Sequence, residues 1–161
     1  DGNVLGWLNE LAFAPVDLNE EAMADEWSTD RGVGCKYFSQ DAVIKLAPAA
    51  GIPLPEMLTP AEKLSAVQEL ATAGDPRALA IFRDIGVYLG HTLPLYAGVY
   101  ELKNLMVLGR VASGIGGELI VSECRRVLAE EYPALRVSVT LPDEQFRRVG
   151  QSVAAASLPE V

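Results

Sequence analysis

Histidine and cysteine are scarce in this chain of 161 residues, which contains one histidine, His91, and two cysteines, Cys35 and Cys124. A single histidine excludes a histidine-rich metal site, and a Ser-His-Asp triad would have to recruit His91. The two cysteines are far apart and form neither a CxxC motif nor a zinc-finger spacing. We therefore predict a reducing, cytoplasmic location and a structural or surface role for His91.

Runs of positive charge and long hydrophobic runs are also lacking. The 13 lysines and arginines are outnumbered by 22 aspartates and glutamates, which gives a net charge of −9. Nucleic acids and anionic membranes select a positive surface, so this balance argues against both as partners. A phosphorylated ligand is not excluded, because its binding depends on local dipoles rather than on the net charge of the protein. No apolar run reaches membrane-spanning length, and no signal-peptide pattern is present.

The elements that the sequence does predict indicate one α/β domain. In the second half helices alternate with strands, which favours a largely parallel sheet flanked by helices. Asp1–Leu8 lacks a Met and is typical of a turn between two strands, so we interpret the chain as a fragment or excised domain. The expected strands are 9–16, 105–108 and 136–141. The expected helices are 39–50, 60–74, 76 to the mid-nineties, 118–130 and 144–157.

Several residues mark where these helices should begin and end. Thr59 and Glu62 form a capping-box pattern around Pro60, which suits a first helical turn. Gly51 follows the helix over 39–50 at the position that glycine favours. Pro94 should kink or end the helix that begins at Pro76.

The most informative segment is the glycine-rich turn after the strand over 105–108. A strand, a turn of small residues and a helix start bring several backbone N–H groups together, beside the positive end of a helix dipole. This geometry suits a nucleotide, although neither a Walker P-loop nor a dinucleotide fingerprint is present. The alternative is a turn that only lets helix and strand pack closely. The candidate nucleotide-binding residues are Gly109, Arg110, Ser113, Gly114, Gly116 and Gly117.

Other candidates each have a structural alternative. Glu10, in Asn9–Phe13, could bind a sugar hydroxyl or lie on an ordinary surface. Trp7 and Trp27 could stack on a sugar, but packing is the commoner use of tryptophan. The arginines 125, 126, 147 and 148 are typical of surface charges that pair with neighbouring glutamates. The acidic group over 20–30 matches no calcium loop and is interpreted as a solvated loop: Glu20, Glu21, Asp25, Glu26 and Asp30.

Taken in order, three motifs resemble the C-terminal half of the ROK family, which comprises sugar kinases and related repressors of the actin-like ATPase superfamily. These are Ile85-Gly-Val-Tyr-Leu-Gly, the strand and turn up to Gly117, and Gly-Gln-Ser-Val-Ala-Ala-Ala over 150–156. The resemblance implies a ribonuclease-H-like lobe in which 107–117 holds the adenosine of ATP. It also places Glu10, with Asn9, at the sugar.

The chain departs from the family pattern at three places. Phe13 stands where the family has a zinc-binding histidine, and Gly34-Cys35 is what remains of its cysteine-rich zinc loop. Zinc is therefore not expected. Arg110 replaces the second glycine of a Gly-Gly pair, so its side chain would crowd or cover the adenine.

The resemblance implies a lobe without catalytic residues of its own. The family's phosphate-binding loop and catalytic aspartate belong to an N-terminal lobe that would precede Asp1, and phosphoryl transfer needs both. The prediction is thus the C-terminal lobe of an ATP- and Mg²⁺-dependent sugar kinase, inactive alone, with 1–58 on the substrate side and 59–161 on the nucleotide side. Its predicted partners are a sugar, a nucleotide and the N-terminal lobe.

Two alternatives stay open. The chain could be the ligand-binding lobe of an ROK-like sugar-responsive transcriptional regulator. It could also serve in self-association as a homodimer, with the apolar helix Pro76–Leu93 packed against its copy, although a core role for that helix is the commoner use.

Overall fold

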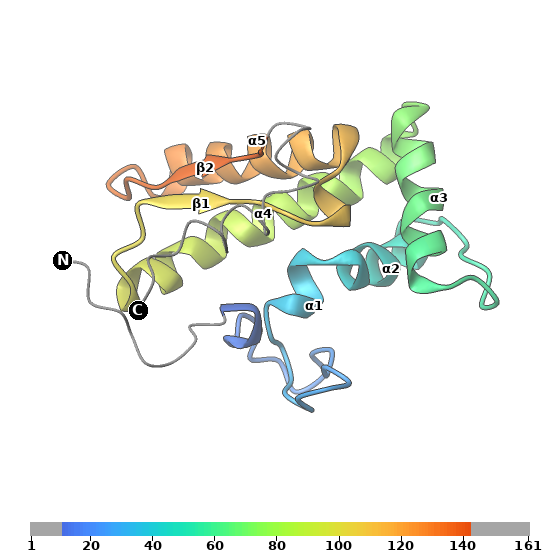
Figure 1. Cartoon of the computed structure of the whole chain (residues 1–161), viewed down its shortest axis with the longest axis horizontal. Coiled ribbons are helices and arrows are strands. Elements are labelled where there is room, and N and C mark those ends of the chain that lie inside the picture. Colours follow the sequence, from blue (N-terminus) through green and yellow to red (C-terminus); the bar gives the residue numbers. More distant parts are fainter. Residues whose placement is uncertain (1–10, 143–161) are drawn as a thin grey trace, which may run out of the picture.

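A computed structural model of the chain describes residues 11–142 (Figure 1). This part is α/β: helices dominate, and two short strands form a small parallel sheet. The elements in chain order are η1 (Leu11–Phe13), α1 (Cys35–Phe38), α2 (Gln40–Ala49), α3 (Pro60–Thr72), α4 (Pro76–Val99), β1 (Asn104–Met106), η2 (Arg110–Ala112), α5 (Gly114–Glu131) and β2 (Ser138–Thr140).

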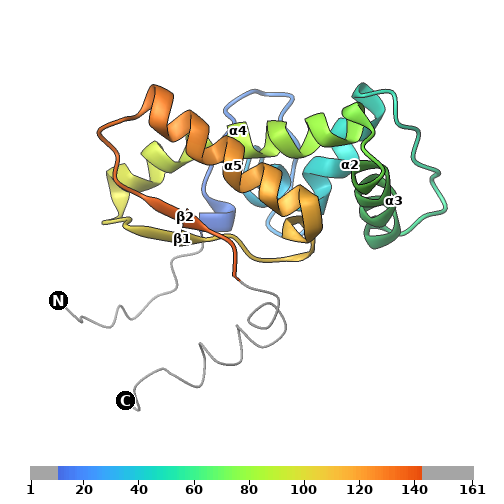
Figure 2. The same cartoon turned by 90° about the horizontal axis from the view of Figure 1, so that it is seen from above.

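The sheet and α5 form a β–α–β unit. Leu105 of β1 pairs with Val139 of β2 in parallel register, and α5 crosses between the two strands (Figure 2). Parallel strands need such a crossover, because a tight turn cannot join them. Two of the three predicted strands, 105–108 and 136–141, are confirmed as the shorter strands Asn104–Met106 and Ser138–Thr140, and their parallel pairing is confirmed. In the described part the sheet is smaller than predicted, with two strands.

Most predicted helix starts are confirmed together with their capping chemistry. The Thr59 hydroxyl accepts a hydrogen bond from the Glu62 N–H at 3.3 Å, and the Glu62 carboxylate accepts one from the Thr59 N–H at 2.7 Å. Ser39 caps α2 by accepting from the Asp41 N–H, and Asp75 caps α4 by accepting from the Arg77 N–H. Each cap satisfies a donor that the first helical turn leaves unpaired.

Three expectations about elements are wrong. The segment 11–16 is not a strand: it contains the single turn η1 and one isolated bridge, Pro15 to Val33. Of the two effects expected of Pro94, a kink or an end, the end is wrong: α4 runs on to Val99, and Leu93 and Tyr96 are buried in that stretch. Finally, α5 begins at Gly114 rather than Glu118, so three glycines assigned to the turn, Gly114, Gly116 and Gly117, are helical. The helix expected over 144–157 lies outside the described residues.

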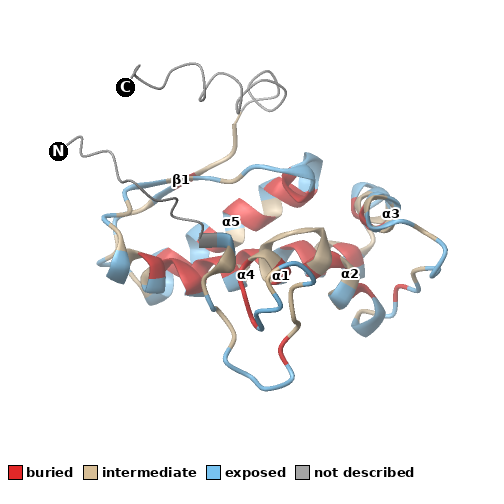
Figure 3. Ribbon diagram, turned by 60° about the horizontal axis from the view of Figure 1, so that its bottom comes forward, coloured by how far each residue is buried: buried red, intermediate tan, exposed pale blue. Residues whose placement is uncertain are grey.

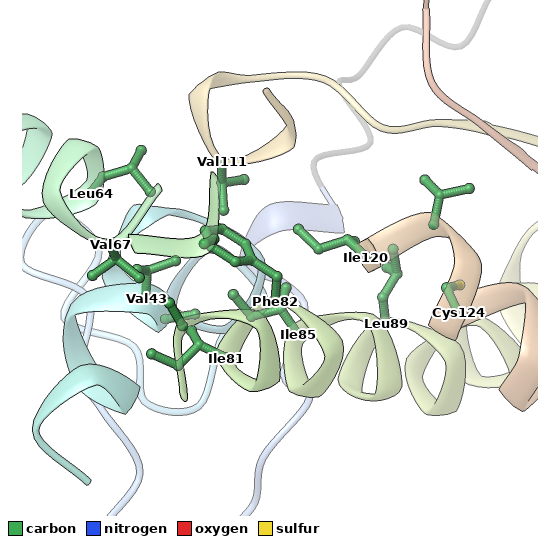
Figure 4. Close-up of a cluster of buried hydrophobic side chains, with 14 of the residues drawn as sticks. Val43, Leu64, Val67, Ile81, Phe82, Ile85, Leu89, Val111, Ile120 and Cys124 are labelled. Carbon is green, nitrogen blue, oxygen red and sulfur yellow. The ribbon is translucent and has the colours of Figure 1, made fainter. Parts of the chain in front are cut away.

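The core lies where α4 crosses α5 and where α2 and α3 pack against the start of α4 (Figure 4). Helices α4 and α5 approach closely at two glycines of α4. A Cβ on Gly86 would lie 2.5 Å from the Ile120 carbonyl oxygen, and one on Gly90 would lie 2.7 Å from Cβ of Val127. The apolar stripe of α4 faces this core, which accounts for its apolarity without a second copy of the chain.

Candidate functional site

The predicted nucleotide turn lies at the carboxyl end of β1 and begins with a left-handed glycine. Gly109 has φ 108°, a conformation that a side chain would strain. The turn η2 follows, held by a hydrogen bond from the Ala112 N–H to the Gly109 carbonyl at 3.1 Å. Ser113 then precedes α5, and its side chain makes no capping hydrogen bond to the first turn of that helix. The start of a helix is a position where backbone N–H groups lack partners within the helix.

The six predicted residues divide into two groups. Gly109, Arg110, Ser113 and Gly114 are exposed, and the chain leaving β1 is largely exposed with them (Figure 3). Gly116 and Gly117 are buried. A Cβ on Gly116 would lie 2.8 Å from the Phe82 ring, and one on Gly117 would clash with the Ala112 carbonyl. Close packing of α5 therefore explains why Gly116 and Gly117 lack a side chain. The other four predicted residues, two of which are not glycine, border solvent.

A hollow of about 330 Å³ lies between this turn and the start of α2. Its size falls in the lower part of the range of small-molecule sites. One wall is local to the predicted turn and the other comes from a distant segment. The lining residues are Phe38, Ser39, Gln40 and Asp41 on one side and Leu108, Gly109, Arg110 and Val111 on the other.

Arg110 supplies the positive charge of this hollow. Its backbone carbonyl accepts a hydrogen bond from the Gln68 amide of α3 at 2.8 Å, which ties the turn to that helix. The side chain is exposed and lines the hollow. It therefore offers a cation to a ligand in the hollow.

Sequence reasoning found the turn but missed the opposite wall. Phe38, Ser39 and Gln40 precede or begin α2, and the sequence predicts only that a helix starts at Ser39. Their approach to Leu108–Val111 depends on how α1 and α2 pack against α4. No local pattern encodes a contact between segments so far apart.

The predicted sugar residues Asn9 and Glu10 lie outside the described residues, as do Trp7, Arg147 and Arg148. The nearest described side chain of that segment, Phe13, contacts Trp27 with ring centroids 5.5 Å apart. Trp27 is 82% exposed, so its remaining surface faces solvent.

Gly34-Cys35 is the segment that corresponds to the zinc loop of the family, and a buried lysine, Lys36, follows it directly. Lys36 is 2% exposed, and its ammonium group bonds the carboxylates of Glu26 and Asp41 and lies 3.6 Å from Asp25. The Cys35 thiol donates to Asp25. The carboxylates of this loop are thus bonded to the Lys36 ammonium group. Within residues 11–142 no group of three or more histidine, cysteine or acidic side chains is placed to hold a metal ion.

The acidic carboxylates of this loop are used locally. Asp25 accepts from the N–H groups of Trp27 and Ser28, at 3.1 and 2.7 Å. The bond from Ser28 is the main cause that lowers the pKa of Asp25 below its usual value, and Lys36 lowers the pKa of Glu26. Asp17 accepts from the Tyr37 hydroxyl, which lowers the Asp17 pKa, whereas burial and this bond raise that of Tyr37. These bonds organise the loop around its own backbone and Lys36.

The remaining candidates have structural partners. Nδ1 of His91 lies 3.0 Å from the Tyr132 hydroxyl, and the two rings meet edge to face. Arg126 pairs with Glu123 and Glu130, as predicted. Arg125 instead donates to the Val139 carbonyl and so ties α5 to β2.

Comparison with known proteins found no family model, no curated protein and no solved structure that matches this chain. Among the described helices, none combines the length and apolarity that crossing a membrane requires.

Proposed function

We propose that this chain is the C-terminal lobe of an ATP-dependent sugar kinase of ROK type and that the hollow beside Gly109–Gly114 receives the adenosine part of ATP. The observation that carries the proposal is that two features of the predicted turn line one hollow. These are the left-handed Gly109 and the exposed, cationic Arg110, and the start of α5 follows them in the chain after Ser113. Together they suit a ligand with a flat body and anionic oxygens.

In this proposal the residues of the chain bind and orient the nucleotide but do not perform the transfer. Mg²⁺ would accompany the phosphates and neutralise charge there. Leu108 and Val111 offer apolar surface to the adenine, and Ser39 and Gln40 offer polar groups to its edge or to the ribose. The base that activates the sugar hydroxyl would come from the N-terminal lobe, so the chain alone binds without turnover. Asn9 and Glu10 would contribute to the sugar site.

Nucleotide binding tests the proposal with a matched pair of variants. Leu108 is 45% exposed and lines the hollow, whereas Met106 is 58% exposed and does not line it. We expect Leu108→Trp to fill the hollow and weaken binding of a fluorescent N-methylanthraniloyl ADP about tenfold or more, a loss of about 1.4 kcal/mol. Met106→Trp should bind as the wild type does. The readout is fluorescence anisotropy, with adenosine as competitor.

Two results would overturn the adenosine assignment. One is the absence of saturable nucleotide binding by the wild-type chain, and the other is an equal effect of the two tryptophan variants. Gly114 is less suitable as a test position: its φ is 58°, so any side chain there strains the turn whether or not a ligand binds.

A second candidate is the ligand-binding lobe of an ROK-like sugar-responsive regulator. The side chain of Arg110 in the hollow favours it, because it occupies space that the resemblance assigns to adenine. This reading predicts binding of a free sugar by the protein that contains this lobe, with no competition by adenosine. Isothermal titration with glucose, N-acetylglucosamine and adenosine separates the two candidates.

A further inference from the structure

A second hollow lies at the opposite end of the β–α–β unit from the glycine-rich turn. It has a volume of about 460 Å³ and occupies the end where α5 stops and β1 and β2 begin, on the left in Figure 1. None of its lining residues belongs to the candidate nucleotide site. A ligand here would therefore be independent of the adenosine assignment.

The rim of this hollow concentrates positive charge on an acidic protein. Lys103, Arg125 and Arg136 line it, although the chain carries a net charge of −9. No carboxylate is among the described residues that line it. Three cations without an acidic neighbour in the lining produce a local positive potential, which attracts an anion.

The three cations differ in how they are held. Nε of Arg125 donates to the Val139 carbonyl at 2.8 Å, and Nη2 donates to the same oxygen, which fixes the guanidinium; its other N–H donors form no hydrogen bond within residues 11–142. Arg136 has no ion-pair partner within residues 11–142. Lys103 pairs with Glu101 at 2.8 Å, but both side chains are largely exposed, and such pairs contribute little. An anion in this hollow would thus meet one fixed cation, Arg125, and two cations that can reorient, Lys103 and Arg136.

The floor of the hollow is apolar. Leu128 is buried, Leu135 is half-buried, and Pro133 adds a rigid ring surface beside them. Ser138 adds a hydroxyl near the cationic rim. A bare inorganic ion would use the rim but leave this floor uncovered.

We propose that this hollow binds an organic anion, a phosphate or carboxylate group carried on an apolar body, with the anionic group against Lys103, Arg125 and Arg136 and the body on Leu128 and Leu135. The three cations favour an anionic group, and the apolar floor of the hollow favours a ligand with an apolar body. The proposal does not depend on kinase activity.

Phenyl phosphate is the probe, titrated into the ¹⁵N-labelled chain and followed by amide chemical shifts. We expect saturable shifts at Ala129, Arg136 and Ser138, and weaker binding as the salt concentration rises. Benzyl alcohol, which has the body without the charge, and inorganic phosphate, which has the charge without the body, should each bind at least fivefold more weakly. No saturable shift with phenyl phosphate, or equal binding of inorganic phosphate, would overturn the proposal.

Matched charge variants locate the site. Arg136→Gln and Lys103→Gln should each weaken phenyl phosphate binding about five- to tenfold, the loss of one charge-assisted contact. Arg126→Gln is the control, because Arg126 is adjacent to Arg125 on α5 but pairs with Glu123 and Glu130 outside the hollow. If all three variants weaken binding equally, net charge rather than this hollow attracts the anion. If Arg136→Gln lowers the melting temperature and leaves binding unchanged, the cations only offset the C-terminal end of the α5 dipole.

Discussion

Nζ of Lys36 lies 2.8 Å from Oδ2 of Asp41, and this ion pair joins α1 to the first turn of α2. The same ammonium group bonds Glu26, so it also fastens the acidic loop to the helices. The Lys36 ammonium group thereby holds together three carboxylates that would otherwise repel one another. The loop needs no metal ion to reach this arrangement.

Replacing the central cation should destabilise the protein. We expect Lys36→Met to lower the free energy of unfolding by about 3 kcal/mol, because it leaves partly buried carboxylates without their counter-charge. Urea denaturation followed by circular dichroism measures this change. Lys45→Met is the control: Lys45 is exposed and lies 5.0 Å from the Tyr37 ring centroid, a contact worth about 1 kcal/mol or less. Equal stabilities of the two variants would contradict the role of Lys36.

The same cluster predicts a pH dependence of stability that becomes weaker in the Lys36→Met variant. The pKa values of Asp25 and Glu26 are lowered in the folded chain, so their contribution is present above about pH 4 and is lost as the pH falls through the folded values. The pKa of Lys36 is raised, so its contribution is present below about pH 10 and is lost at higher pH.

Thermal melts between pH 3 and 7 test this dependence. The wild-type melting temperature should fall steeply below about pH 4. In Lys36→Met the fall should be shallower, because Glu26 loses the cation that lowers its pKa, whereas Asp25 keeps its bond from Ser28. Parallel curves for the two proteins would show that the cluster does not control the acid response.

The crossing of α4 and α5 predicts opposite effects for two glycines of the same helix. Gly86→Ala places a methyl group against the Ile120 backbone and should cost about 2–3 kcal/mol. Gly98→Ala meets no atom within 4 Å and should add about 0.5–1 kcal/mol, because alanine favours a helix. Equilibrium unfolding of both variants provides the comparison. Tolerance of alanine at position 86 would contradict the close crossing.

The cap of α3 can be tested with two threonines of similar exposure. Thr59→Ala removes both hydrogen bonds of the hydroxyl and should lower the free energy of unfolding by about 1 kcal/mol. Thr72→Ala, at the other end of the helix, removes only a bond to the Gln68 carbonyl and should change stability by about 0.5 kcal/mol or less. Chemical denaturation distinguishes the two values.

Both thiols should react slowly in the folded chain. Cys124 is fully buried, and burial raises its pKa to about 12. Cys35 is half-buried, and burial with the nearby Asp25 raises its pKa as well. Because the thiolate is the reactive form, iodoacetamide at pH 7.5 should modify Cys35 slowly and leave Cys124 unmodified until urea unfolds the chain. Peptide mass spectrometry gives the rates, and modification of native Cys124 would contradict its placement.

The residues that sequence analysis located correctly act on their near neighbours. Thr59 and Asp75 cap helices within their own turn, so their sequence context determines their role. The errors arise where distant segments decide the outcome. Tyr96 is buried where α4 runs past Pro94, and Gly116 lies close against the Phe82 ring of α4, which favours a position inside α5.

In the candidate site, too, the features set by neighbouring residues were predicted and those set by distant segments were not. The turn at Gly109 was predicted because strand, glycine and helix are consecutive, whereas its opposite wall at Phe38–Asp41 arises from tertiary packing. The basic hollow escaped prediction for the same reason, since Lys103, Arg125 and Arg136 come from three separate segments.

The parallel pairing of β1 with β2 also bears on the order of folding. The two strands are separated in the chain by the whole of α5, so their hydrogen bonds cannot form by zipping outward from a turn. We expect the α4–α5 contact to form first and the strand pair to close last, over a helix already in place. The glycine-rich turn and the basic hollow lie at the two ends of that late-closing unit. Each would therefore become complete only in the final step of folding, and a molecule bound at either end would slow unfolding more than it speeds folding.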